Sequence, residues 1–198
     1  MKLNLIITCA NLNSQERSDK YISCFEQVKS FQNYFDSISV LETISIQDCN
    51  YFSNCPFDKI YSNIGNPYSD KGYNWARHMA NFLRNTLYDN FIFLTGRYKI
   101  INDNFIKYAS SQNSYKLIAK NEGDIYPHER GVHSFYFYFE KNKLLQFIEG
   151  ILNDKDKLTP VEWRFKSFME KDSECQILPK TFFLGLETDI SSGIIQKV

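Results

Sequence analysis

The sequence predicts an α/β protein with a mostly parallel, doubly wound sheet and flanking helices. Short apolar runs alternate with longer segments whose apolar residues recur at helical spacing, which is the order of elements in such sheets. The first run, Leu3 to Cys9, lacks polar–apolar alternation, as is typical of a strand buried on both faces. No internal repeat or linker interrupts the 198 residues, so we expect one domain covering residues 1–198.

Each element follows from a local pattern. Leu3 to Cys9 is a continuous apolar run and predicts a strand, and Ser14 is a suitable N-cap for a helix that reaches about residue 32. Polar residues predict a loop at 45–56 and a tail after residue 186. The same patterns predict, in order, strands at 38–44 and 57–62, a helix at 69–88, a strand at 91–94, a helix at 103–110, strands at 115–120 and 134–140, helices at 141–153 and 160–171, and a strand at 181–186.

Composition excludes several classes of protein. Basic and acidic residues number 23 each, and this balance argues against a nucleic-acid partner. The five cysteines show no CxxC spacing, which favours reduced thiols over a zinc site or a disulfide framework. No apolar run approaches the roughly 18 residues of a transmembrane helix. We therefore expect a cytoplasmic protein without a transmembrane segment, and peripheral membrane contact stays open.

The strand at 91–94 stops abruptly at Thr95, Gly96, Arg97 and Tyr98. In open α/β sheets, ligands bind outside the carboxyl ends of the strands, so these four residues are the first candidates for a site. No acidic pair follows this strand to hold a metal ion.

Three segments carry a family resemblance: Asp70 to Asn74, Leu94 to Tyr98, and Pro160 to Trp163. In order and spacing they resemble a group of short bacterial and viral glycosyltransferase-like proteins of the GT-A type, within the nucleotide-diphospho-sugar transferase superfamily. The resemblance extends to about residue 170. It implies a GT-A-like, Rossmann-like domain that transfers a sugar from a nucleotide-sugar donor to a glycan or lipid-linked acceptor, as in polysaccharide biosynthesis. GT-A enzymes usually carry a metal-binding Asp-x-Asp motif after the fourth strand. Here Thr-Gly-Arg-Tyr stands there, so we expect no metal and no other cofactor.

Breaking a sugar–phosphate bond leaves negative charge on the departing nucleoside diphosphate, and a metal ion or fixed cations must stabilise it. Arg97 is the candidate catalytic cation, helped by Lys71 at a helix start and by the backbone N–H of Gly96. The alternatives are that Arg97 pairs with a carboxylate such as Glu42, and that Lys71 is an ordinary solvated lysine.

Other candidates for donor binding come from the resemblance and from position along the chain. Glu42 is expected to face the nucleoside, or else to be a strand-end charge in solvent. Tyr98 either stacks on a sugar or packs in the core, and we favour the core. The complete set of candidate substrate-binding residues is Thr8, Asn11, Arg17, Glu42, Lys71, Asn74, Thr95, Gly96, Tyr98 and Asp124.

Glu162 is the candidate catalytic base on the acceptor side, because an inverting transferase needs a base near the acceptor hydroxyl. The competing interpretation is a capping box with Thr159 at the N-cap, Pro160 at N1 and Glu162 at N3. Asp124 belongs to a polar and aromatic loop at 122–130 that could bind the acceptor. For the whole protein, the alternative to an enzyme is a degenerate transferase fold that binds nucleotide or glycan without turnover.

Overall fold

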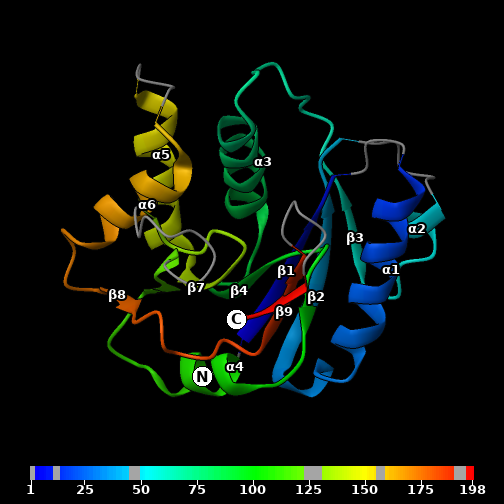
Figure 1. The fold of residues 1–198 in the computed structure, drawn as a ribbon. Helices are drawn as coiled ribbons and strands as arrows, with labels where there is room; N and C mark the ends of the chain where they lie inside the picture. Colours follow the sequence, from blue (N-terminus) through cyan, green and yellow to red (C-terminus); the bar gives the residue numbers. More distant parts are fainter. Residues whose placement is uncertain (1–2, 11–13, 45–49, 123–130, 155–158, 190–194) are drawn as a thin grey trace.

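The structure, a computed structural model, describes residues 3–10, 14–44, 50–122, 131–154, 159–189 and 195–198. Its centre is a seven-stranded sheet in the order β3-β2-β1-β4-β7-β6-β8 (Figure 1). Neighbouring strands are parallel except where β7 pairs with β4 and with β6. The strands are β1 (Leu3–Cys9), β2 (Phe35–Glu42), β3 (Asp58–Tyr61), β4 (Asn90–Thr95), β6 (Leu117–Lys120), β7 (Tyr136–Glu140) and β8 (Cys175–Leu178).

Helices cover both faces of this sheet (Figure 1). One hydrophobic cluster packs α1, α2 and α4 against one face, and a second packs α3, α5 and α6 against the other. The predicted mostly parallel α/β fold with flanking helices is therefore confirmed. The helices are α1 (Gln15–Lys29), α2 (Asn50–Ser53), α3 (Lys71–Asn85), α4 (Asn104–Ser111), α5 (Lys141–Asn153) and α6 (Val161–Met169), with a 3-10 turn at Gln32–Tyr34.

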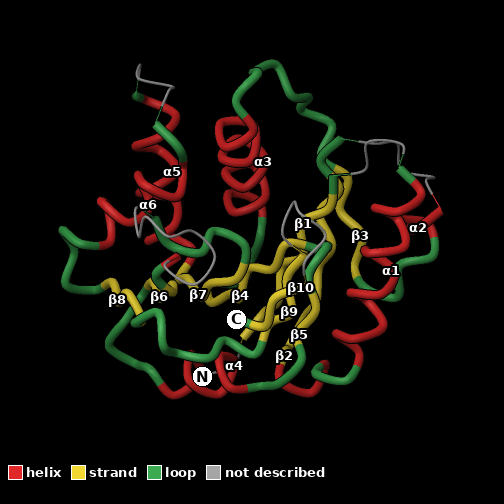
Figure 2. The backbone as a smooth tube through the Cα atoms, in the orientation of Figure 1, coloured by secondary structure: helices red, strands yellow, loops and turns green. Residues whose placement is uncertain are grey.

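A smaller antiparallel sheet closes the end of the chain onto the segment that follows β4 (Figure 2). Its strands are β5 (Lys99–Ile100), β9 (Leu186–Asp189) and β10 (Ile195–Lys197). Leu186 and Val198 exchange backbone hydrogen bonds of 3.2 and 2.8 Å. The carbonyl of Gly185 accepts from the N–H of Ile101 at 2.8 Å, which links this sheet to the loop before α4.

The second half of the chain departs most from the sequence prediction. The strand predicted at 181–186 is wrong: Phe182 and Phe183 lie in a loop, where Phe182 packs edge-on against Tyr108 of α4 at 5.2 Å between ring centroids. The missed strands are β5, β8, β9 and β10. The predicted loop at 45–56 contains α2, and the helix predicted to reach residue 88 ends at Asn85. Leu87, within the predicted helix, is 95% exposed.

Candidate functional site

The carboxyl ends of the parallel strands form one edge of the sheet. Register aligns Thr8 with Thr95, Cys9 with Glu42, and Glu42 with Tyr61, so β1, β2, β3 and β4 end side by side. Beyond β4, the N–H of Thr95 donates to the carbonyl of Phe135, just before β7, at 2.9 Å. The segment that leads into β7 is therefore part of the same edge.

Gly96 fits tightly into this edge. Its N–H donates to the carbonyl of Thr8 at 2.9 Å. A Cβ here would lie 2.8 Å from Sγ of Cys9 and 3.1 Å from both Cγ2 of Ile7 and Cδ1 of Tyr21, closer than real Cβ atoms pack. The N–H of Gly96 is thus engaged within the sheet edge, contrary to the expectation that it would bind phosphate, and the small residue is needed for packing.

Arg97 projects from the loop that follows. Its Cζ lies 5.6 Å from the ring centroid of Tyr98, and the side chain is half-buried. Among the residues that the structure describes, no carboxylate forms an ion pair with Arg97, so the predicted alternative pairing with Glu42 is not formed. Tyr98 packs edge-on against Phe135 at 4.9 Å between ring centroids, which agrees with the favoured core role.

Glu42 is fully buried, so the interpretation as a charge reaching solvent is wrong. Its Oε1 accepts from the N–H of Ile44 at 2.8 Å, and its carbonyl accepts from the N–H of Ser62 at 2.9 Å. Both bonds hold the chain where β2 and β3 end.

The chain after β1 is held by α1. Nη1 of Arg17 donates to the carbonyl of Ala10 at 2.9 Å. The Tyr21 hydroxyl donates to the same carbonyl at 3.0 Å and accepts from the N–H of Ala10 at 2.9 Å. Burial raises the pKa of Tyr21, so this hydroxyl keeps its proton and its donor role. Tyr21 is not among the residues that the sequence predicted for the site.

The start of α3 meets the start of α6. Asp70 caps α3 by accepting from the N–H of Tyr73 at 2.7 Å, and Lys71 is exposed on the first turn. A Cβ on Gly72 would overlap the side chain of Val161, so glycine is what lets the two helix starts approach. The Asn74 amide donates to the carbonyl of Tyr68 at 2.7 Å and accepts from its N–H at 3.3 Å, and so orders the loop before α3.

Glu162 lies in the first turn of α6 but does not form the predicted capping box. The helix begins at Val161 after Pro160, and no side-chain hydrogen bond caps it. Oε1 of Glu162 accepts from the Ser134 hydroxyl at 3.0 Å instead. Because Ser134 is next to Phe135, this bond joins Glu162 to the sheet edge that carries Arg97.

Glu122, two residues after the end of β6, is a second carboxylate in this region. It is 6% exposed, and its pKa is raised to about 7 by burial and by the charge of Glu162, with Lys166 opposing the shift. Sequence reasoning placed Glu122 only at the start of a polar loop. An acidic residue two positions after the end of a buried strand was the signal that would have found it. The candidates Asn11 and Asp124 lie outside the described residues.

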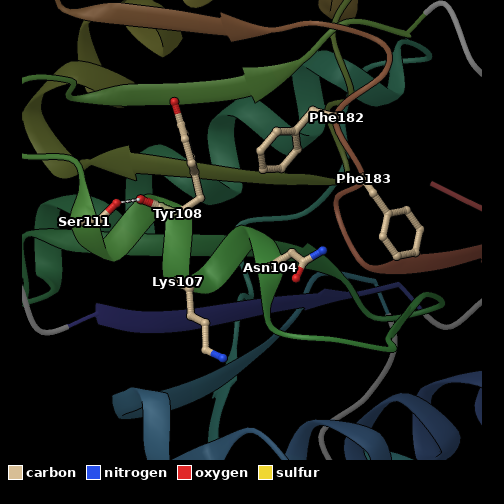
Figure 3. A pocket seen from close by; sticks show the side chains of 6 residues that line it. All are labelled: Asn104, Lys107, Tyr108, Ser111, Phe182 and Phe183. Carbon is tan, nitrogen blue, oxygen red and sulfur yellow. Dashed lines mark hydrogen bonds between the residues drawn. The ribbon is translucent and has the colours of Figure 1, made fainter.

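A groove of about 460 Å³ lies on a different part of the molecule, between α4 and the loop that carries Phe182 and Phe183 (Figure 3). Its lining residues are Asn104, Lys107, Tyr108, Ser111, Phe182 and Phe183, none of which is a predicted site residue. Within the described segments, no set of three or more His, Cys, Asp or Glu side chains is arranged to hold a metal ion. Over the same residues, each helix is too short or too polar to cross a bilayer.

Comparison with known proteins places the fold and nothing finer. No protein-family model matches the chain, and no curated protein matches its sequence. The fold belongs to the α/β proteins whose parallel sheet carries one antiparallel strand, and many solved structures share it.

Three of these structures are each similar to this chain over 90% of its length. They are a 4-diphosphocytidyl-2C-methyl-D-erythritol synthase from Anaerococcus prevotii DSM 20548 (TM-score 0.58, 14% identity, 86% of that chain), a protein from Aquifex aeolicus VF5 (0.54, 10%, 86%) and HddC from Yersinia pseudotuberculosis (0.52, 12%, 91%). At these identities the likeness concerns the fold alone.

Proposed function

We propose that this protein is a glycosyltransferase that moves a sugar from a nucleotide-sugar donor to a glycan or lipid-linked acceptor. The observation that carries the proposal is Arg97. Its guanidinium follows β4 at the carboxyl edge of a parallel sheet, half-buried, with no ion-pair partner in the described part of the chain. This is the edge where open α/β sheets bind their ligands.

The proposed role of Arg97 is to stabilise the leaving group. As the bond between the anomeric carbon and the phosphate oxygen breaks, charge builds on the diphosphate, and a planar guanidinium can donate two parallel hydrogen bonds to it. Lys71, exposed on the first turn of α3, adds a cation at a helix start where free N–H groups favour an anion. With these two cations in place, the proposed reaction does not require a divalent metal ion.

Glu162 supports an acceptor on the neighbouring side of the same edge. Its carboxylate is fixed by the Ser134 hydroxyl and does not cap its helix, so the structural role that competed with a chemical one is removed. A carboxylate held here contributes negative charge beside the group that removes the acceptor hydroxyl proton.

The name of one structural neighbour also supports a nucleotide ligand. The Anaerococcus prevotii protein is named for a diphosphocytidyl product, and its fold matches this chain over most of both lengths. From that name we infer only that a nucleoside diphosphate binds this protein at the carboxyl edge of its sheet.

A thermal-shift panel tests the proposal. UDP-, GDP-, CMP- and dTDP-sugars are each added to the purified protein with Mn²⁺ or with EDTA, and donor turnover is then measured for each stabilising ligand. A ligand at about one hundred times its Kd stabilises the folded state by about 2.7 kcal/mol, which raises Tm by several degrees. We expect one donor class to stabilise in EDTA and to be turned over. Strict dependence on Mn²⁺ would overturn the metal-independent mechanism, and stabilisation without turnover would favour a binding protein.

A further inference from the structure

Glu122 is a buried carboxylate near the carboxyl end of β6. It lies two residues after Lys120, the last residue of β6, and is 6% exposed. In the described residues, its side chain makes no hydrogen bond and no ion pair. Burying an ionised carboxylate without partners is costly, so such a group either stays protonated or serves a ligand.

Gly131 brings Glu122 and Glu162 together. A Cβ on Gly131 would overlap Oε2 of Glu122 and would lie 2.8 Å from Cβ of Glu162. The two glutamates therefore flank the same glycine. The backbone fixes the arrangement, because the N–H of Glu122 donates to the carbonyl of Gly131 at 3.1 Å and the N–H of Val132 donates to that of Glu162 at 3.4 Å.

The two carboxylates have different surroundings. Glu162 accepts a hydrogen bond from the Ser134 hydroxyl at 3.0 Å. Glu122 accepts no such bond from the described residues. It faces the charge of Glu162 and, more weakly, that of Lys166, both on α6. Burial and the Glu162 charge raise the pKa of Glu122 to about 7. Paired carboxylates with separated proton affinities are a recurring arrangement for acid–base chemistry.

We propose that Glu122 is the catalytic base of the transfer reaction and that Glu162, which flanks the same glycine, is a positioning residue. The assignment rests on the proposed glycosyl transfer. The acceptor hydroxyl gives its proton to the Glu122 carboxylate while its oxygen bonds to the anomeric carbon. The bond from that carbon to the phosphate oxygen breaks, and its electron pair leaves with the nucleoside diphosphate, stabilised by Arg97.

Carboxyl titration of the full chain tests the pair without any donor. Selective ¹³C labelling of glutamate lets the side-chain carboxyls be followed by NMR, and loss of one signal in Glu122→Gln identifies that of Glu122. We expect a midpoint near 7 in the wild type that falls on the order of one pH unit in Glu162→Gln. Glu170→Gln, an exposed change just after α6, is the matched control and should leave it unchanged. A Glu122 midpoint below 5 overturns the inference.

Kinetics supply the second readout. Glu122→Gln should lower kcat by roughly 10²- to 10⁴-fold, as expected for loss of a general base, while donor-induced thermal stabilisation persists. In the wild type, kcat should rise with increasing pH, and the midpoint of this rise should lie near 7. In Glu162→Gln the midpoint should move to lower pH. Gly131→Ala, which forces the two glutamates apart, should move the midpoint in the same direction.

The two proposals fail in different ways. Transfer that persists in Glu122→Gln, with an unchanged pH profile, overturns the role of Glu122 and leaves the glycosyltransferase assignment standing. Absence of transfer from every donor in the wild type overturns that assignment, and the role of Glu122 as its base falls with it.

Discussion

The hydroxyl of Ser134 donates a hydrogen bond to Oε1 of Glu162 at 3.0 Å. This bond joins the segment before β7 to the first turn of α6. The Glu162 carboxylate therefore faces the sheet edge instead of capping its own helix. The bond also connects α6 to the segment that contains Phe135, whose carbonyl accepts from the N–H of Thr95.

Ser134 and Glu162 should be energetically coupled. Ser134→Ala and Glu162→Ala each remove the bond, and together they should cost less than the sum of the single changes by about 1 kcal/mol in free energy of unfolding. Urea denaturation of the wild type, both single variants and the double variant measures this coupling. Because the Glu162 side chain bonds Ser134 and not the start of α6, Glu162→Ala should leave the helical circular dichroism signal intact. Strictly additive effects would show that the bond contributes nothing.

Substitutions at Arg97 should show whether the site needs only a positive charge or the planar guanidinium of arginine. Arg97→Ala should abolish donor-induced stabilisation and lower kcat/KM by about 10²- to 10³-fold. Arg97→Lys keeps the charge but loses the two parallel hydrogen bonds, so its loss should fall between the wild type and the alanine variant. Arg84→Ala is the control, because Arg84 makes an exposed ion pair with Glu149 at 3.2 Å near the end of α3. Unchanged donor binding in Arg97→Ala would remove Arg97 from the mechanism.

Sequence patterns predicted elements well where local residues decide the structure. The run Leu3 to Cys9 is apolar throughout and forms β1 over that range. The order of strands in the second half depends on contacts between distant segments, and no local pattern shows that β7 runs antiparallel. The edge strand β8 has a half-buried, mixed sequence and was missed for that reason.

The residues of the candidate site divide in the same way, into those that a local pattern predicts and those that meet only in the folded structure. The Thr95 to Tyr98 segment is recognisable because an apolar strand stops at it. Glu122 and Glu162 meet only because three segments pack at Gly131, and their spacing of 40 positions gives no signal in the sequence.

Gly96 should tolerate no side chain. A Cβ would crowd Cys9, Ile7 and Tyr21 at the sheet edge, and overpacking of a close-packed region typically costs about 1–3 kcal/mol. Gly96→Ala should therefore lower the free energy of unfolding by about that amount. Gly150→Ala is a matched control with the opposite sign: it lies in α5 with nothing within 4 Å of the added Cβ, and glycine in a helix interior is destabilising by about 0.5–1 kcal/mol relative to alanine. Chemical denaturation of both variants measures the contrast.

His133 should make the protein sensitive to acid. It is fully buried, and neither ring nitrogen has a hydrogen-bond partner among the described residues. Burial, and secondarily the Lys120 charge, lower its pKa from 6.5 to about 3. Below pH 6.5 the unfolded chain binds a proton here that the folded protein does not. The contribution of His133 to the free energy of unfolding is complete above pH 6.5. As pH falls toward 3, this contribution is lost by about 1.4 kcal/mol per pH unit.

His133→Phe should remove that acid penalty, so the variant should gain stability relative to the wild type steadily from pH 7 to pH 4. His78 provides the comparison. Burial also lowers the pKa of His78, to about 4, but its Nδ1 lies 2.6 Å from Oγ of Ser62 and its Nε2 3.0 Å from Oδ1 of Asn66. His78→Phe should relieve the same acid penalty yet lose about 1–3 kcal/mol at pH 7.5, because it leaves the buried Ser62 hydroxyl without its partner. Unfolding free energies measured at each pH decide the matter, and a pH-independent difference between His133→Phe and the wild type would contradict a buried, neutral His133.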